Sequence, residues 1–227
     1  MLWLVATSES TITARRVAEM MVGEFRASPW RTARTMARGK RIVVGRRFRV
    51  MGVNHIHIRQ GRLMLGTNFY GFADTRMGGL IRVRGRLEVD GIVMLAQGNR
   101  WYIGPKAVVT IGHQSYFSPM TKVMIFSGLT VGRGCNIAWD CQFLDDDQHV
   151  LTLPGVEPPP SSAPIEIGDH VWIASRATIL KGTRIGDGCV VASGAIVRGD
   201  FSETGCLIGG TPAKVIRRGV VWGSEVQ

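Results

Sequence analysis

Residues 164–200 read PIEIGDHVWIASRATILKGTRIGDGCVVASGAIVRGD, and an aliphatic side chain returns there at every sixth position. These positions are Ile167, Ile173, Ile179, Ile185, Val191 and Val197. Positions six apart share no face of a 3.6-residue helix, so the period excludes an amphipathic helix. A second register, four residues after the first, is mostly small: Val171, Ala177, Thr183, Cys189 and Ala195. Repeats this short bury their apolar side chains only by stacking, which predicts a β-helix.

The six-residue step continues upstream with lower fidelity. It is kept by Val131, Ile137 and Phe143, by Ile111, Phe117 and Val123 after a two-residue slip, and by Ile81, Leu87 and Val93. We therefore expect one β-helical domain over residues 41–218, with an extension at 1–40 and a tail at 219–227.

One long stretch interrupts the pattern. Val131 and Ile167 are 36 residues apart, a whole number of hexads, yet QHVLTLPGVEPPPSSA at residues 148–163 lacks the repeat. Its three consecutive prolines cannot donate hydrogen bonds to a β-ladder. The sequence thus predicts a loop extruded at about 148–163, and long loops within compact domains are usually functional.

The formal net charge of +11 is concentrated toward the front of the chain. Between residues 15 and 49, only Glu19 and Glu24 oppose the cations Arg15, Arg16, Arg26, Arg31, Arg34, Arg38, Lys40, Arg41, Arg46, Arg47 and Arg49. Such a field attracts nucleic acid, an anionic lipid surface or acidic substrates, or it simply keeps a protein soluble. Residues 8–40 show helical periodicity, which predicts one or two helices packed across the start of the β-helix.

The N-terminal MLWLVATSES has no basic n-region and a short apolar run, so we expect neither a signal peptide nor a membrane span, and a cytoplasmic location. The four cysteines form no CxxC pair, which argues against a zinc ribbon or a disulfide scaffold. Cys135, Cys141 and Cys189 fall in the small register and are expected to be packed side chains. Cys206 falls outside the register.

The segment IAWDCQFLDDDQHV, residues 137–150, places His149 two residues after Asp147 and four after Asp145. An imidazole near its unperturbed pKa suits proton abstraction near neutral pH, and a neighbouring carboxylate can hold its tautomer. Spacing alone leaves open an ordinary solvated acidic loop with an incidental histidine.

Residues 164–200, together with IGGTPAKVIRR at 208–218, closely resemble the hexapeptide-repeat acyltransferases. The elements I-G-D-x-V-W-I, V-A-S-G-A-I-V and G-x-P-A-K carry the resemblance, which is strong from Val131 to Arg218. The group includes galactoside, maltose and xenobiotic acetyltransferases and many enzymes of polysaccharide biosynthesis. The resemblance implies an all-β fold: a left-handed parallel β-helix of hexapeptide repeats, here with a short helical extension and an extruded loop. It also implies a homotrimer with active sites between subunits.

The resemblance also implies roles for individual residues. The pattern W-D-x-x-x-x-D-x-D-x-H is similar to that of members whose histidine is the general base, and here it falls on Trp139, Asp140, Asp145, Asp147 and His149. His149, with Asp145 and Asp147, would act on the acceptor, and Trp139 and Asp140 would line its pocket. Ala138 and Gln148 replace the serine and aromatic residue of many relatives, so the acceptor pocket differs.

The same resemblance implies acetyl-CoA as the acyl donor and no metal. Trp172 and Ser175 match positions near its thioester and pantetheine arm, and Ala192 and Ser193 would present backbone groups to its amides. Arg198, Lys214 and Arg217 are candidate partners for its phosphates, since fixed cations with several donors bind phosphate well.

The leading hypothesis is therefore O-acetylation of a sugar hydroxyl on a glycan or polysaccharide precursor. N-acetylation of a nucleotide-linked amino sugar is the main alternative, because it uses the same base and donor. A zinc hydratase would need three converging imidazoles, and the histidines do not recur at coil spacing. A non-enzymatic solenoid that binds anions or nucleic acid is the third possibility. Contact with an anionic membrane or a lipid-linked substrate is left open by the sequence. We expect no nucleic-acid partner.

Overall fold

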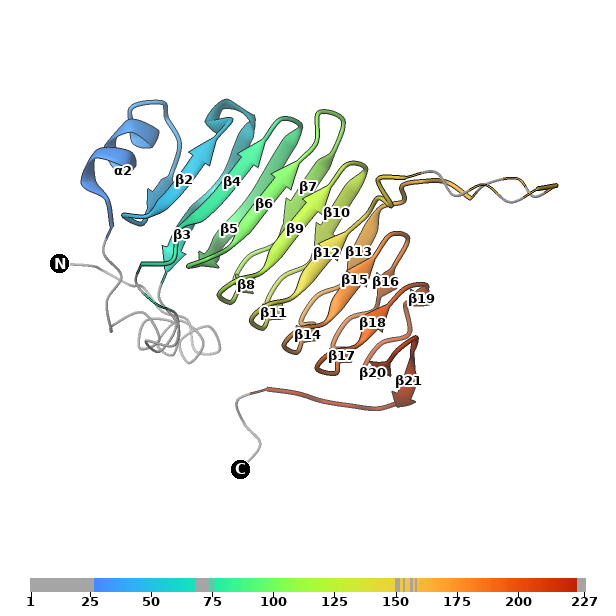
Figure 1. Ribbon diagram of the computed structural model, residues 1–227. Helices are drawn as coiled ribbons and strands as arrows, with labels where there is room; N and C mark the ends of the chain where they lie inside the picture. The colour runs from blue at the N-terminus through green and yellow to red at the C-terminus, as the bar shows by residue number, and fades with distance from the viewer. Residues whose placement is uncertain are drawn as a thin grey trace.

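The computed structural model describes residues 27–67, 74, 76–149, 152, 154–155, 157 and 159–223. Parallel strands stack in successive coils from α2 at one end to β21 at the other (Figure 1). The chain is a left-handed parallel β-helix, and the fold expected from the hexads is confirmed. No helix in these described ranges is long and apolar enough to cross a membrane.

The coils have three faces. The first face is one sheet of seven parallel strands: β2 (Phe48–Met51), β4 (Gly79–Val83), β6 (Arg100–Ile103), β9 (Lys122–Ile125), β12 (Gln142–Leu144), β15 (Thr178–Leu180) and β18 (Ile196–Val197). The second face contains β7 (Val108–Ile111), β10 (Gly128–Val131), β13 (Ile165–Ile167), β16 (Arg184–Ile185) and β19 (Asp200–Phe201). The third contains β1 (Ile42–Val44), β8 (Tyr116–Phe117), β11 (Asn136–Ile137), β14 (Trp172–Ile173), β17 (Val190–Val191) and β20 (Leu207–Gly210).

Two long strands join the second and third faces. β3 (Ile56–Thr67) follows the short 3-10 helix η1 (Val53–His55), and β5 (Arg86–Ala96) pairs with it in parallel around the corner. At the bend Gly61 lies against Gly91, both with positive φ, and a Cβ on Gly61 would lie 2.3 Å from the Gly91 carbonyl. Only glycine permits this approach of two backbones.

The six-residue register is the core of the molecule. In the C-terminal coils, Ile167 pairs with Ile185 and Ile179 with Val197, eighteen residues or three hexads apart. Every member of both predicted registers is buried, including Cys135, Cys141 and Cys189. The cysteines therefore pack as small interior side chains, as expected.

Cys206 also belongs to this interior, although the hexad count excludes it. Val191 pairs with Ile208, so this coil is one residue shorter than three hexads. Cys206 then lies in the coil above Cys189, and its backbone N–H lies 3.3 Å from the Cys189 Sγ. A single deletion in a turn hides the position from a strict count.

At the N-terminal end, α2 (Pro29–Met36) packs against β1 and begins at Pro29, which occupies the first helical turn. The first strand starts at Ile42, close to the boundary predicted at residue 41. The part of the helical prediction that covers residues 8–26, and the last four residues of the 219–227 tail, lie outside the described residues. At the other end, β21 (Ala213–Arg217) folds back antiparallel on β20.

Candidate active site

The extruded loop leaves the β-helix at the corner between the first and second faces. We call this corner the loop corner; it comprises residues 126–128, 145–149, 159–164, 181–182 and 198–199 of successive coils. The loop projects away from the coils after β12 and returns at β13 (Figure 1). Its base is a short antiparallel stem, in which Asp146 bridges Ser162 and the Asp147 N–H donates to the Ser161 carbonyl at 2.9 Å.

Asp145 anchors the first strand of this stem. Its side chain is buried, and its two carboxylate oxygens accept the backbone N–H groups of Phe126, Ser127 and Gly128 at 2.7–2.8 Å. The two-residue slip in the hexad count falls at this turn, so the inserted residues create the backbone nest that receives the carboxylate. Burial raises the pKa of the Asp145 carboxyl, against the three N–H donors that favour the charged form.

Lys181 joins the two strands of the stem. Its side chain is only 5% exposed, and its Nζ contacts the Asp147 carboxylate and the carbonyls of Pro160 (2.5 Å) and Ser161 (3.3 Å). Lys181 is not among the site residues predicted from the sequence. The signal was available, because Leu144 pairs with Leu180, so Lys181 occupies the position of Asp145 one coil later.

His149 lies just beyond the stem that Asp145 and Lys181 hold, and its side chain is exposed. Both Asp145 oxygens are occupied by backbone N–H groups, and Asp147 faces Lys181. Within the described part of the chain, no hydrogen bond joins the His149 imidazole to either carboxylate. The two aspartates therefore fix the base of the loop, and His149 is presented to solvent from that base.

The candidate donor residues lie elsewhere, at the corner between the third and first faces. We call it the serine corner; its successive coils contribute Trp139 with Asp140, Ser175 with Arg176, and Ser193 with Gly194. The stacking is direct: the Arg176 N–H donates to the Trp139 carbonyl at 3.1 Å, and the Gly194 N–H donates to the Ser175 carbonyl at 2.9 Å. The Ser175 and Ser193 hydroxyl oxygens are 3.0 Å apart.

This corner forms an open strip of small groups. A Cβ on Gly194 would meet nothing within 4 Å. Ala192 differs from expectation in one detail: its N–H already donates to the Ile208 carbonyl at 2.8 Å, and its carbonyl accepts the Ala195 N–H at 3.2 Å. The polar groups of the strip include the hydroxyls of Ser175 and Ser193.

Trp139 and Asp140 stand at the first coil of the serine corner. The Trp139 side chain is 37% exposed. Asp140 has a positive φ of 58° and its carboxylate forms an ion pair with Lys122 at 2.6 Å. The turn thus fixes an exposed aromatic ring next to a carboxylate.

Trp172 lies on the third face, near the opposite corner of that face, and is 39% exposed. The C-terminal segment passes close to it: the Trp222 ring stacks on His170 at 4.1 Å between centroids and lies 6.1 Å from the Trp172 ring. The Trp222 indole N–H also donates to the His170 carbonyl at 2.9 Å. His170 is therefore an exposed side chain that packs against the C-terminal segment.

The three candidate phosphate-binding cations are exposed but separated. Lys214 pairs with Gly209 in the β20–β21 hairpin, above the last coil of the serine corner. Arg217 pairs with Leu207 at the far end of the same hairpin. Arg198 lies at the loop corner, directly before Gly199.

The structure thus divides the predicted site residues between two edges of one prism. His149, Asp145, Asp147 and Arg198 belong to the loop corner, whereas Trp139, Asp140, Ser175, Ala192, Ser193 and Lys214 belong to the serine corner. The first-face strands β12, β15 and β18 run between them. One chain therefore does not bring the candidate base and the candidate donor strip together.

Metal-ligand geometry is a separate question. In the described residues, no group of three or more His, Cys, Asp or Glu side chains is placed to hold a metal ion. His55 ends η1 and His57 lies at the start of β3. Desolvation and the nearby Lys40 and Arg86 lower the pKa of His57.

Comparison with known proteins places the chain among transferases. Residues 164–199 match the family described as bacterial transferase hexapeptide (six repeats). The uncharacterized 24.8 kDa protein in the cps region of Klebsiella pneumoniae is 32% identical over 184 residues, which cover 81% of this chain and 82% of that protein. The 2,3,4,5-tetrahydropyridine-2,6-dicarboxylate N-acetyltransferase of Staphylococcus aureus is 49% identical over 75 residues, 33% of this chain and only 29% of that enzyme.

Solved structures show the same fold at low identity. The polySia specific acetyltransferase NeuO aligns with a TM-score of 0.52 and 21% identity, covering 83% of this chain and 81% of its own. A second similar structure is that of a mutant of AntD, an N-acyltransferase from Bacillus cereus, in complex with dTDP-4-amino-4,6-dideoxyglucose and coenzyme A. It aligns with a TM-score of 0.52 and 15% identity, covering 86% of this chain and 91% of the AntD chain. Fold and relatives together define an acyltransferase built on a left-handed β-helix. The chain belongs to the bacterial transferase hexapeptide family.

Proposed function

We propose that the protein transfers an acetyl group from acetyl-CoA to a sugar hydroxyl of a glycan or polysaccharide precursor, with His149 as the general base. The observation that carries the proposal is the stem at the base of the loop, which Asp145 and Lys181 hold in place. The hexad repeat breaks where Asp145 and Lys181 fix a rigid stem, and His149 is exposed immediately beyond it. A base must be both held and accessible to an incoming acceptor.

The chemistry needs few groups. The His149 imidazole takes the proton of the acceptor hydroxyl while the hydroxyl oxygen forms a bond to the carbonyl carbon of the thioester. The carbon–sulfur bond then breaks, and the leaving CoA sulfur takes up the proton from the imidazolium. A thioester is already activated, so no covalent enzyme intermediate is required. The buried cysteines agree with this direct transfer, because burial raises the pKa of Cys135 to about 11 and that of Cys141 to about 12.

The serine corner supports the donor half of the proposal. Its open strip, with the Ser175 and Ser193 hydroxyls and Lys214 at the far end, suits an extended pantetheine arm that ends in phosphates. Because the strip and His149 lie on different edges of one chain, the proposed site is completed by a neighbouring subunit. We therefore propose a homotrimer in which the loop corner of one subunit faces the serine corner of the next.

N-acetylation of a nucleotide-linked amino sugar is the second candidate. It is favoured by the named activities of two similar proteins, the Staphylococcus N-acetyltransferase and AntD, although the first matches only a third of this chain and the second shows the fold alone. The linkage formed distinguishes the candidates. Hydroxylamine cleaves an O-acetyl ester under mild conditions and leaves an N-acetyl amide intact.

The test of the base is the His149→Ala variant. We expect the turnover number for acetyl-CoA with an active acceptor to fall about 100-fold or more, the usual scale for loss of a general base, while calorimetric binding of CoA is unchanged. His55→Ala, which removes an exposed histidine at the end of η1, is the matched control and should keep full turnover. Wild-type turnover in the His149→Ala protein would remove His149 from the chemistry.

A further inference from the structure

The charge of the molecule is divided along the axis of the β-helix. Residues 27–139 contain 18 Lys and Arg against 3 Asp and Glu, whereas residues 140–227 contain 7 against 11. The proposed site lies in the second, acidic part. The strongly basic coils before it are not used by any step of the proposed chemistry.

Part of this basic charge lies in register on one surface. On the first face, Arg49 pairs with Leu80, Leu80 with Arg100 and Arg100 with Lys122. The parallel row, two residues further along each strand, is Met51, Arg82, Tyr102 and Met124. We call these outward side chains of β2, β4, β6 and β9 the basic face. Neighbouring strands are about 4.8 Å apart, so its groups recur at that interval along the axis.

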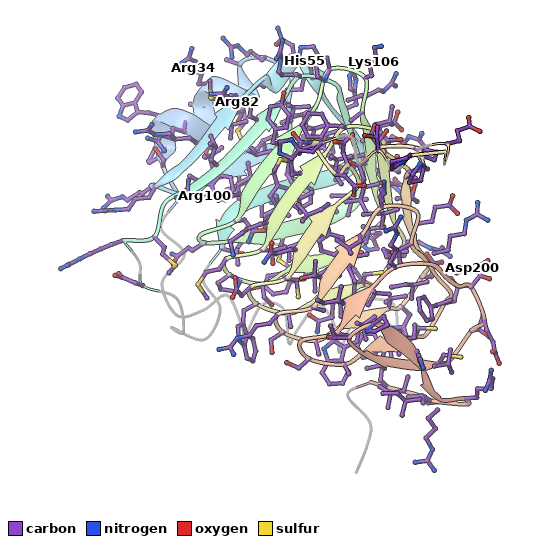
Figure 2. The ribbon with its side chains drawn as sticks, turned by 45° about the vertical axis from the view of Figure 1, so that its right-hand side comes forward. Arg34, His55, Arg82, Arg100, Lys106 and Asp200 are labelled. Atoms are coloured by element: carbon purple, nitrogen blue, oxygen red, sulfur yellow. The ribbon has the colours of Figure 1, made fainter. Side chains whose placement is uncertain are left out.

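The side chains of the basic face point away from the core. The residues that alternate with them, among them Phe48, Ile81, Trp101 and Val123, are buried. Arg49, Arg82, Arg100 and Lys122 are exposed. Figure 2 shows Arg82 and Arg100 on the same side of the N-terminal coils as Arg34 of α2.

Within the described ranges, most of these cations have no carboxylate partner. Lys122 pairs with Asp140, and the Arg82 guanidinium contacts the Met51 sulfur at 3.4 Å. Among the described residues, Arg49, Arg82 and Arg100 form no ion pair. An array of unneutralised guanidinium groups beside Tyr102, whose ring packs 5.4 Å from Phe126, offers charge for anions and an amphipathic aromatic surface for sugar rings.

The basic face is continuous with the site. The same sheet runs on from β9 through β12 and β15 to β18, and the loop corner and the serine corner are its two edges there. An extended chain lying along the sheet would pass from the arginines to the strands between His149 and Ser193. A polymer can bind along this continuous face and still reach the site, whereas binding to a membrane plane does not require the face to continue to the site.

We propose that the basic face binds the acceptor, and that the acceptor is a polyanionic glycan, a chain of sugars that carry carboxylate or phosphate groups. The proposal rests on the proposed function for what is transferred, but binding itself does not require transfer. Several sugars bind along β2–β9 and place a later sugar of the same chain near the two corners.

The test measures binding without acetyl-CoA. The probe is an end-labelled oligogalacturonate of about a dozen sugars, one carboxylate on each, with maltododecaose as the neutral chain of equal length; fluorescence anisotropy is followed against salt. In Arg82→Gln/Arg100→Gln, we expect oligogalacturonate affinity to fall tenfold or more. The negative slope of log affinity against log salt should become shallower by about two, one for each cation removed. Maltododecaose should not bind.

The matched control is Arg62→Gln/Arg133→Gln, which removes two exposed cations from other parts of the coils and should change affinity less than about twofold. An equal loss in both double variants would show a diffuse effect of net charge and overturn the proposal, as would no binding by the wild type. Arg82- and Arg100-dependent binding to phosphatidylcholine/phosphatidylglycerol vesicles without binding of the oligosaccharide would assign the face to lipid instead. Because no donor is present, these results are independent of the His149→Ala outcome.

Discussion

At the scale of single residues, buried polar side chains shape the site more than the acidic motif suggests. Spacing nominated Asp145 and Asp147 as partners of His149. In the structure Asp145 binds a backbone nest and Asp147 faces Lys181. Lys181 itself carries no motif and becomes visible only when residues are compared across coils. Side-chain partners of this kind depend on which turns stack, and one linear pattern does not contain that information.

The cysteines provide a residue-scale prediction. Burial raises the pKa of Cys135 to about 11 and that of Cys141 to about 12, and it raises the pKa of Cys189. Iodoacetamide at pH 8 should therefore leave these three thiols unmodified in the native protein and alkylate them after denaturation, as read by peptide mass mapping. Rapid alkylation of native Cys135 or Cys141 would contradict their placement in the core.

The same shifts predict the pH dependence of stability. A thiol in the unfolded chain ionises near pH 9, whereas the folded thiols of Cys135 and Cys141 stay neutral to about pH 11. The contribution of these thiols to the free energy of unfolding is therefore complete below pH 9. It is lost as the pH rises toward 11, by up to about 1.4 kcal/mol per thiol for each pH unit. Denaturant unfolding at pH 8, 9 and 10 should show this decline, and Cys135→Ala should show a smaller one.

At the scale of elements, the hexads predict the interior almost completely because every coil buries the same positions. Both registers and the loop near residues 148–163 follow from counting. The count fails where a coil changes length: at the two-residue insertion that holds Asp145, at the short coil that places Cys206, and in β3 and β5, which continue around a corner at Gly61 and Gly91. Length changes occur in turns, where hydrophobic periodicity carries no signal.

Lys181 should control the order of the loop. In Lys181→Met the Asp147 carboxylate and the carbonyls of Pro160 and Ser161 lose their common donor. Loss of a hydrogen-bonded charge typically costs about 1.5–3 kcal/mol, so opening of the stem should rise about tenfold or more. Limited thermolysin digestion should cleave within residues 148–163 correspondingly faster, with turnover reduced.

The matched control is Lys122→Met, which removes an exposed lysine paired with Asp140. Exposed ion pairs contribute little to stability, so its digestion rate should stay near that of the wild type. Equal protection of the loop in Lys181→Met and wild type would show that the stem does not depend on the buried lysine.

At the scale of the whole molecule, the division of the site between two edges has the largest consequence. A single prism carries the candidate base on one corner and the candidate donor strip on another. If both serve one reaction, the subunits must be arranged so that each site takes its base from one chain and its donor strip from the next, which cyclic symmetry around a threefold axis allows.

Subunit mixing tests this central claim most directly. His149→Ala lacks the base, and Ser193→Trp fills the donor strip; each homotrimer should be inactive while retaining the circular dichroism of the wild type. After the two variants are denatured, mixed equally and refolded together, about one quarter of the interfaces should combine an intact loop corner with an intact serine corner, restoring about one quarter of wild-type transfer from acetyl-CoA. If the refolded mixture forms mixed trimers and stays as inactive as its parents, base and donor act within one chain, and the account is wrong.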